Sequence, residues 1–335
     1  MATRVTIRHV AKAAGVSVTT VSDSLSGKGR LPEETRKKVL ETAKSLGYQA
    51  STAAKSLASG RTGILMMSIA APETAVTSMW NVEFFVRVMS AASEVASSRG
   101  YALAMAPIGE WAGKTTIPYD GAIVVDPVPE NRLVQRALVD GRPLVTVGRL
   151  DSAVTSCVDN DFSAVVSEVL DHLWERGSRR PGLISSPISA SYAADCVHAY
   201  EGWCKARGVQ PRLEVVAGSL SEDTGRQAAE KLLSREDAPD SIFATLDRLA
   251  LGASMAASVL RDVMIVSLGD SSAVAGASTP LTAVELQPVE IGRAAAEMLI
   301  EQIEGEQSTR NVTIPAHLVV RASTADGAVR SARKT

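Results

Sequence analysis

The chain has few of the residues that mark secreted, membrane or disulfide-bonded proteins. Of its 335 residues only 4% are aromatic, and three are cysteines, Cys157, Cys196 and Cys204. An odd number of cysteines without CxxC spacing predicts reduced, buried thiols in a cytoplasmic protein. The sequence also has no run of about 18 apolar residues and no secretory signal near its N-terminus, so we expect neither a membrane span nor export.

Sequence patterns that predict an enzyme are missing as well. The segment GEWAGKTT resembles a phosphate-binding loop, but it is one residue too short between its glycines and runs into Ile-Pro instead of a helix. The four histidines are scattered and lack metal-ligand spacing. We therefore expect a protein that is not an enzyme, with no catalytic residue, no metal and no cofactor.

Charge is divided unevenly along the chain. Residues 1–60 contain ten Lys or Arg and four Asp or Glu, a net charge of +6, whereas the remainder carries −8. The length predicts two or three domains, and the 45% of hydrophobic residues is typical of globular ones. A basic head on an acidic body indicates a polyanionic partner for the head, although a solvated basic face would have the same composition.

The basic segment has the pattern of three short helices. Thr6 and Ser17 are expected to cap the first two, and Gly15 suits the tight turn between them. A second helix with small hydroxyl side chains on its outer face fits the DNA major groove. A three-helix module that docks a protein is the alternative. The expected buried positions are Ile7, Val10, Ala11, Ala14, Val21, Leu25, Val39, Leu40, Ala43 and Leu46.

The strings VTIRHVAKAAGVSVTTVS, ETRKKV and LGY resemble the DNA-binding headpiece of the LacI/GalR family of bacterial repressors. The resemblance continues, more sparsely, over residues 4–322. It implies that a double-stranded DNA operator is read by Val18, Thr19 and Asp23. It further implies that phosphates are contacted by Ser17, Thr20, Ser22, Arg30 and Thr35.

Position 23 departs from the family pattern, because many members have an arginine where this chain has Asp23. Arginine reads guanine through a bidentate contact, which aspartate cannot make. Aspartate can accept a hydrogen bond from the amino group of cytosine, or it can keep phosphates at a distance. We therefore expect an operator that differs from the commonest one of the family.

Residues 51–60 are implied by the same resemblance to form a hinge helix that enters the minor groove. Leu57 matches the apolar wedge that opens a base step, and Ser51, Ala54 and Lys55 are implied to face the groove or its phosphates. The family commonly has Pro and Asn where this chain has Ala50 and Ser51. An ordinary linker that contains a leucine is the alternative.

From Thr62 onward, short apolar runs alternate with amphipathic helices, which predicts parallel sheets covered on both faces. The resemblance implies an α/β core of two such lobes, of the periplasmic-binding-protein type, behind the all-α headpiece. One helix of the first lobe is expected to be reduced or lost after YALAMAP, where the connection is short. The expected domains are 1–50 (headpiece), 51–60 (hinge), 61–157 with about 285–317 (first lobe), 158–284 with about 318–325 (second lobe) and a flexible tail, 326–335.

The cleft between the lobes is where family members hold a small-molecule effector. Cys196 stands in place of an arginine that contacts sugars or purines, and Leu246 in place of an asparagine. Their loss predicts a less polar or differently shaped effector, or none, because sugar hydroxyls need such partners. The expected cleft residues are Trp80, Phe84, Tyr192, Cys196, Asp247 and Asp270, although the aromatic ones suit a hydrophobic core equally well.

The resemblance implies a homodimer that bridges a near-palindromic operator and represses transcription, with an effector that shifts the angle between the lobes. No heptad pattern follows Ala322, so a tetramerising coiled coil is not expected. A solute-binding protein is the first rival, but it would need an export signal. The second rival is a protein-interaction adaptor, which would lack the salt-dependent DNA affinity of a repressor.

Overall fold

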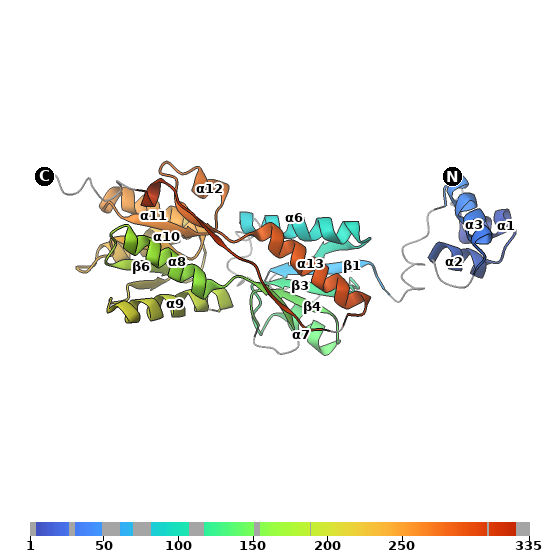
Figure 1. Cartoon of the computed structure of the whole chain (residues 1–335), viewed down its shortest axis with the longest axis horizontal. Helices are drawn as coiled ribbons and strands as arrows, with labels where there is room; N and C mark the ends of the chain where they lie inside the picture. Colours follow the sequence, from blue (N-terminus) through green and yellow to red (C-terminus); the bar gives the residue numbers. More distant parts are fainter. Residues whose placement is uncertain are drawn as a thin grey trace. The chain divides into compact units, whose positions relative to one another are not determined.

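The computed structural model describes residues 5–26, 31–48, 61–69, 82–106, 117–150, 155–187, 189–306 and 308–325 (Figure 1). Contacts between residues divide the chain into two units, the headpiece Met1–Gly63 and the core Ile64–Thr335. The predicted hinge, Arg30, Trp80, the short connection in the first lobe and the C-terminal tail lie outside the described residues. In the described part, no helix is long and apolar enough to cross a membrane.

The headpiece contains α1 (Ile7–Ala14), α2 (Val18–Ser26) and α3 (Glu33–Ser45), as predicted. Gly15 ends α1 with a φ of +69°, a conformation that glycine adopts without strain. The prediction for α3 was partly wrong, since Leu40 and Leu46 are 46% and 37% exposed. Successive residues of a helix are rotated by about 100°, so Leu40 turns away from the face that buries its neighbour. The buried hydrophobic side chains among the described residues of the headpiece are Val10, Ala11, Ala14, Val21, Val39 and Ala43.

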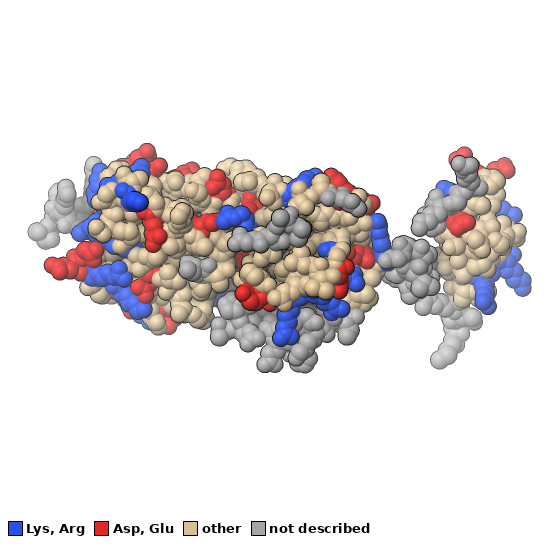
Figure 2. Space-filling view, turned by 90° about the horizontal axis from the view of Figure 1, so that it is seen from below, with Lys and Arg blue, Asp and Glu red and all other residues tan. Residues whose placement is uncertain are grey.

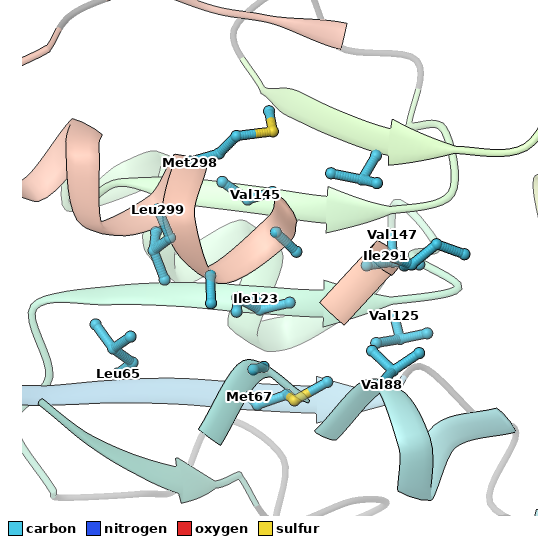
Figure 3. Packing of buried hydrophobic residues seen from close by; sticks show 14 of the residues in the cluster. Leu65, Met67, Val88, Ile123, Val125, Val145, Val147, Ile291, Met298 and Leu299 are labelled. Atoms are coloured by element: carbon cyan, nitrogen blue, oxygen red, sulfur yellow. The ribbon is translucent and has the colours of Figure 1, made fainter. Parts of the chain in front are cut away.

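The first lobe is built on a parallel sheet with the strand order β11-β5-β4-β3-β1-β2. Alternate residues of its central strands face opposite layers of helices, so both faces are apolar. Figure 3 shows one face, where Leu65, Met67 and Ile123 pack against two helices. The elements are β1 (Ile64–Ile69), α6 (Glu83–Ser98), β2 (Ala102–Met105), β3 (Gly121–Val125), α7 (Arg132–Val139), β4 (Leu144–Val147), β5 (Ser156–Asp159), α13 (Pro288–Glu304) and β11 (Asn311–Thr313).

The second lobe repeats this plan with the order β12-β10-β9-β8-β6-β7, in which only β12 runs antiparallel to its neighbour. One apolar cluster joins the sheet to α10 and α11, and another joins it to α8 and α9. The elements are α8 (Phe162–Glu175), β6 (Pro181–Ser185), α9 (Ser191–Arg207), β7 (Leu213–Val215), α10 (Glu222–Leu233), β8 (Ser241–Ala244), α11 (Asp247–Leu260), β9 (Met264–Leu268), α12 (Ser272–Ala275), β10 (Thr282–Glu285), β12 (His317–Val319) and the short helix Ala322–Thr324.

The chain passes between the two sheets three times, after β5, after β10 and after β11. Asn160, which is only 5% exposed, connects all three passages. Its side-chain Nδ2 donates to the carbonyl of Leu286 at 3.2 Å and to that of Ile314 at 2.8 Å. One amide therefore fixes the three crossover segments to one another at the junction of the lobes.

Candidate DNA-binding surface and effector pocket

The first turn of α2 presents the predicted base-reading positions to solvent. Val18 is 43% exposed, and Thr19 beside it is exposed as well. Ser17 Oγ accepts a hydrogen bond from the backbone N–H of Thr20 at 3.0 Å and lies 2.8 Å from the Thr20 hydroxyl. Such a cap satisfies one of the free N–H groups at a helix start, and it fixes where α2 begins.

The rest of α2 is divided into an inner and an outer face. Val21 is fully buried, and the hydroxyl of buried Ser24 donates to the Thr20 carbonyl at 2.7 Å. Ser22 and Asp23, and Thr35 on α3, remain partly exposed. Lys and Arg side chains lie on the headpiece surface seen in Figure 2, and the exposed ones include Arg8, Lys12, Lys37, Lys38 and Lys44.

The core contains a pocket between its lobes, at the carboxyl ends of strands from both sheets. It encloses about 740 Å³ of empty space, including the part that opens to solvent. Parallel sheets characteristically bind ligands at this edge. The apolar part of the lining includes Phe84, Phe85, Phe162, Tyr192, Leu246 and Leu268.

Acidic side chains dominate the polar part of the described lining, which contains Glu83, Asp126, Asp247, Asp270 and Glu285. Two of them are neutralised by arginines. Asp270 forms a two-point ion pair with Arg321, both contacts at 2.8 Å, and Glu285 pairs with Arg87 at 3.1 Å. Asp247 opens α11 and accepts a hydrogen bond from the backbone of Arg248.

Asp126 follows β3 and has the electrostatic environment least favourable to a carboxylate. Burial, together with the charge of Asp159, raises its pKa to about 7. Burial also raises the pKa of Asp159 to about 6, against the hydrogen bond that its Oδ1 accepts from the Asn160 N–H. Asp159 Oδ2 is a buried atom that finds no hydrogen-bond partner within the described part of the chain. Asp126 in the pocket lining and Asp159 near it are therefore two carboxyl groups whose surroundings disfavour ionisation.

Direct contacts between the lobes flank the pocket. On one side, Arg149 forms an ion pair with Asp195 of α9 at 2.7 Å, and its N–H donates to Ser191 Oγ at 3.0 Å. On the other side, Glu83 Oε2 accepts a hydrogen bond from the Ser272 N–H at 2.8 Å. These contacts are polar and partly exposed, so they can break without uncovering a hydrophobic core.

The predicted cleft residues differ in where the structure places them. Phe84, Tyr192, Asp247 and Asp270 lie in the pocket lining. The prediction for Cys196 was wrong, because its side chain lies on the inner face of α9, fully buried in the hydrophobic cluster of the second lobe. The three cysteines are free and buried, as predicted.

Sequence reasoning missed Asp126, Phe162 and Glu83. Asp126 had one signal, since it directly follows the buried strand GAIVV in a parallel sheet and therefore lies at the ligand-binding edge. No pattern marked Phe162, whose ring centroid lies 5.9 Å from that of Tyr192 although 30 positions separate the two residues.

Comparisons with known proteins agree with this architecture. Residues 6–51 match the family described as "Bacterial regulatory proteins, lacI family", and residues 170–324 match a "Periplasmic binding protein-like domain". The Ribose operon repressor of Halalkalibacterium halodurans is 30% identical over 96% of this chain and 98% of its own. The chain belongs to the LacI family of bacterial regulatory proteins. Its relatives are transcription regulators and not enzymes.

Other members of the family support the assignment over the whole length. The regulator CelR of Thermobifida fusca is 27% identical over 96% of this chain and 98% of its own. The CelR–cellobiose complex superimposes with a TM-score of 0.71 at 25% identity, over 96% of this chain and 100% of that one. The Lac repressor dimer bound to operator and the anti-inducer ONPF shares the fold, with a TM-score of 0.78 at 22% identity over 96% and 99% of the two chains.

Proposed function

We propose that this LacI-family regulator represses transcription as a homodimer on a near-palindromic operator, and that a small molecule in the pocket between its lobes sets its DNA affinity. The observation that carries the proposal is the exposed first turn of α2, capped by Ser17, within a segment, residues 1–60, whose net charge is +6. A helix that begins with small, exposed side chains on a basic surface can approach base edges closely. A two-fold dimer supplies two such helices to two half-sites.

The proposed readers of the bases are Val18, Thr19 and Asp23, with Asp23 accepting a hydrogen bond from a cytosine amino group. The proposed phosphate contacts are Ser17, Thr20, Ser22, Arg30 and Thr35. The proposed minor-groove segment is the hinge, with Leu57 as the wedge between base pairs and Ser51, Ala54 and Lys55 beside it. Because the operator lies on the bacterial chromosome, the protein works in the cytoplasm.

Regulation follows from the construction of the core. An effector that contacts both lobes favours one angle between them, because it binds that arrangement more tightly than any other. The three crossover segments fixed by Asn160 are the pivot for this movement. The polar contacts that Arg149 and Glu83 make across the lobes break and re-form as the lobes move.

The experiment that tests the proposal is selection of bound duplexes from random DNA with the full-length protein. The expected result is enrichment of an inverted repeat with half-sites about one helical turn apart. The Asp23→Arg variant, selected in parallel, is expected to prefer guanine at the position of each half-site where the unsubstituted protein prefers cytosine. The control Asp262→Asn, at an exposed position of the core unit, should leave the enriched sequence unchanged. Enrichment of no sequence by the unsubstituted protein would contradict the proposal.

A further inference from the structure

The described part of the pocket lining is unusually apolar for a site that would hold a sugar. Three aromatic side chains reach it from separate elements, Phe84 from α6, Phe162 from α8 and Tyr192 from α9. The Tyr192 hydroxyl is already hydrogen-bonded to Ser186 at 2.8 Å, within the protein. The three rings therefore contribute apolar, aromatic surface to the pocket wall, and aromatic rings attract apolar groups and cations.

The charge of the lining is negative after its internal ion pairs are subtracted. Arg87, the one cation among the described lining residues, is held by Glu285, and Arg321 neutralises Asp270 from outside the lining. The acids that remain without a cationic partner are Glu83, Asp126 and Asp247. An anionic ligand would meet three acids without a cationic partner, and no free cation, among the described residues.

Asp126 is the acid that most lacks a partner. No hydrogen bond or ion pair joins its carboxylate to another described residue, and the charge of half-buried Asp159, whose Oδ2 has no hydrogen-bond partner in the described part of the chain, acts on it. Its backbone adopts φ +50°, in the left-handed region that side chains other than glycine rarely occupy. Backbone strain and unpaired buried polar atoms both cost stability, and both are concentrated at ligand-binding sites.

We propose that the effector of this regulator is a small amine with an apolar, aromatic-sized body, whose ammonium group contacts the Asp126 carboxylate while its body packs among Phe84, Phe162 and Tyr192. The ammonium supplies the positive charge that the lining lacks, and the rings around it add cation–π attraction. This inference rests on the proposed function, because it names the chemical class of the effector in the same pocket.

Other ligand classes fit the pocket less well. A sugar needs several amide and charged groups that face the ligand unpaired, and here the arginines are engaged with Asp270 and Glu285. A metal ion needs at least three suitable ligands together, and no such group of His, Cys, Asp or Glu occurs among the described residues. A monocation with an apolar body requires only one or two carboxylates and a hydrophobic wall.

The test is calorimetric titration of the full-length protein with three amines and their neutral counterparts of equal shape. The pairs are benzylamine with benzyl alcohol, 2-phenylethylamine with 2-phenylethanol, and tryptamine with tryptophol, and cellobiose and ribose represent sugars. We expect at least one amine to bind about tenfold more tightly than its alcohol, as one desolvated charge contact allows. The sugars are expected to bind more weakly than that amine.

Variants separate the Asp126 contact from general charge attraction. Asp126→Asn is expected to remove the preference for the amine over the alcohol, Asp126→Glu to retain part of it, and Asp262→Asn, an exposed control, to leave it unchanged. Binding of a sugar or an alcohol as tightly as the best amine would overturn the inference, and so would binding of none of the amines. Operator binding by the ligand-free protein, measured on the same samples, reports the proposed function separately. If the protein binds the operator but none of the amines, the inference about the effector is refuted while the proposed function stands.

Discussion

The headpiece and the core use polar side chains in opposite ways. In the headpiece, the described groups assigned to DNA are exposed or partly exposed, and the local bonds between Ser17 and Thr20 span three residues. In the core, Asp126 and Asp159 follow or end strands of one sheet and are held where ionisation is unfavourable. DNA brings phosphates to a surface that water already stabilises, whereas the pocket stores an unfavourable charge that a ligand can relieve.

The two regions therefore differ in how much folding stability their functional side chains cost. The headpiece can keep its reading positions without loss, because an exposed hydroxyl or valine costs a small helix bundle little. The ionised Asp126 carboxylate makes the unliganded core less stable than a neutral side chain at that position would. Substitutions in the two regions should therefore affect DNA binding and folding stability separately.

The largest effect is expected from a charge placed on the DNA-facing turn of α2. Thr19→Asp should weaken operator binding by about 100-fold, because the new carboxylate faces base edges and phosphates. The midpoint of thermal unfolding should change little, since Thr19 is exposed. Thr309→Asp, an equally exposed threonine in the core, is the charge-matched control and should retain affinity. Equal losses in both variants, measured by fluorescence anisotropy, would refute a specific role for α2.

The next largest effect is expected at Asn160, which joins the three crossover segments. Asn160→Ala should lower the free energy of unfolding by about 2 kcal/mol, because the carbonyls of Leu286 and Ile314 lose their buried donor. Asn311→Ala removes an exposed asparagine and should cost less than about 0.5 kcal/mol. Urea unfolding of both variants measures the difference. Similar values for the two would show that the crossover segments do not depend on this amide.

Removal of the pocket charge should stabilise the core, with a definite pH dependence. The pKa of Asp126 is about 7 in the folded chain, whereas its ordinary value is 3.8. Its ionisation therefore lowers the free energy of unfolding more and more as the pH rises from 3.8 to about 7. Asp126→Asn should therefore add about 1–2 kcal/mol at about pH 8 and almost nothing near pH 4, because the partial exposure of the side chain reduces the full linkage value. Asp159, Tyr192, Glu83 and Asp247 are the other titratable groups around it.

The measurement is the difference in thermal midpoint between the unsubstituted chain and Asp126→Asn across this pH range. Asp262→Asn repeats the chemical change at an exposed position and should show no such slope. A difference that shrinks as the pH rises would contradict the assignment of a raised pKa.

The smallest effect is expected at the ion pair between the lobes. Arg149 is 56% exposed, and its contact with Asp195 is open to solvent. A double-mutant cycle with Arg149→Ala and Asp195→Ala should give a coupling energy of at most about 1 kcal/mol for folding. A substantially larger coupling would mean that the pair holds the lobes together and is not readily exchanged when they move.

The sequence predicted the parts of the molecule that depend on short-range patterns. The helices of the headpiece and the apolar strands of both lobes follow from periodicity, and the family resemblance supplied their order. The resemblance did not supply the pocket chemistry, because it implied a ligand contact at Cys196, whereas the core covers this thiol completely. Residues such as Phe162 reach the pocket only through packing between elements far apart in the chain.

Leu40 illustrates the same limit on a smaller scale. Its hydrophobicity predicted burial, but the six-residue core of the headpiece is complete without it, and one helical step places it in solvent. Composition and periodicity predict which helices form. Which apolar side chains stay exposed to solvent depends on how many of them a small core has room to bury.

The most direct test of the central claim, that the headpiece reads DNA, is a titration of the full-length protein with its selected operator and with a scrambled duplex at increasing salt. We expect the operator to be bound about 1000-fold more tightly than the scrambled duplex. Its affinity should fall by about 10³-fold between about 50 and 200 mM salt, as phosphate contacts release counterions. Equal affinity for the two duplexes, or an affinity independent of salt, would contradict the account.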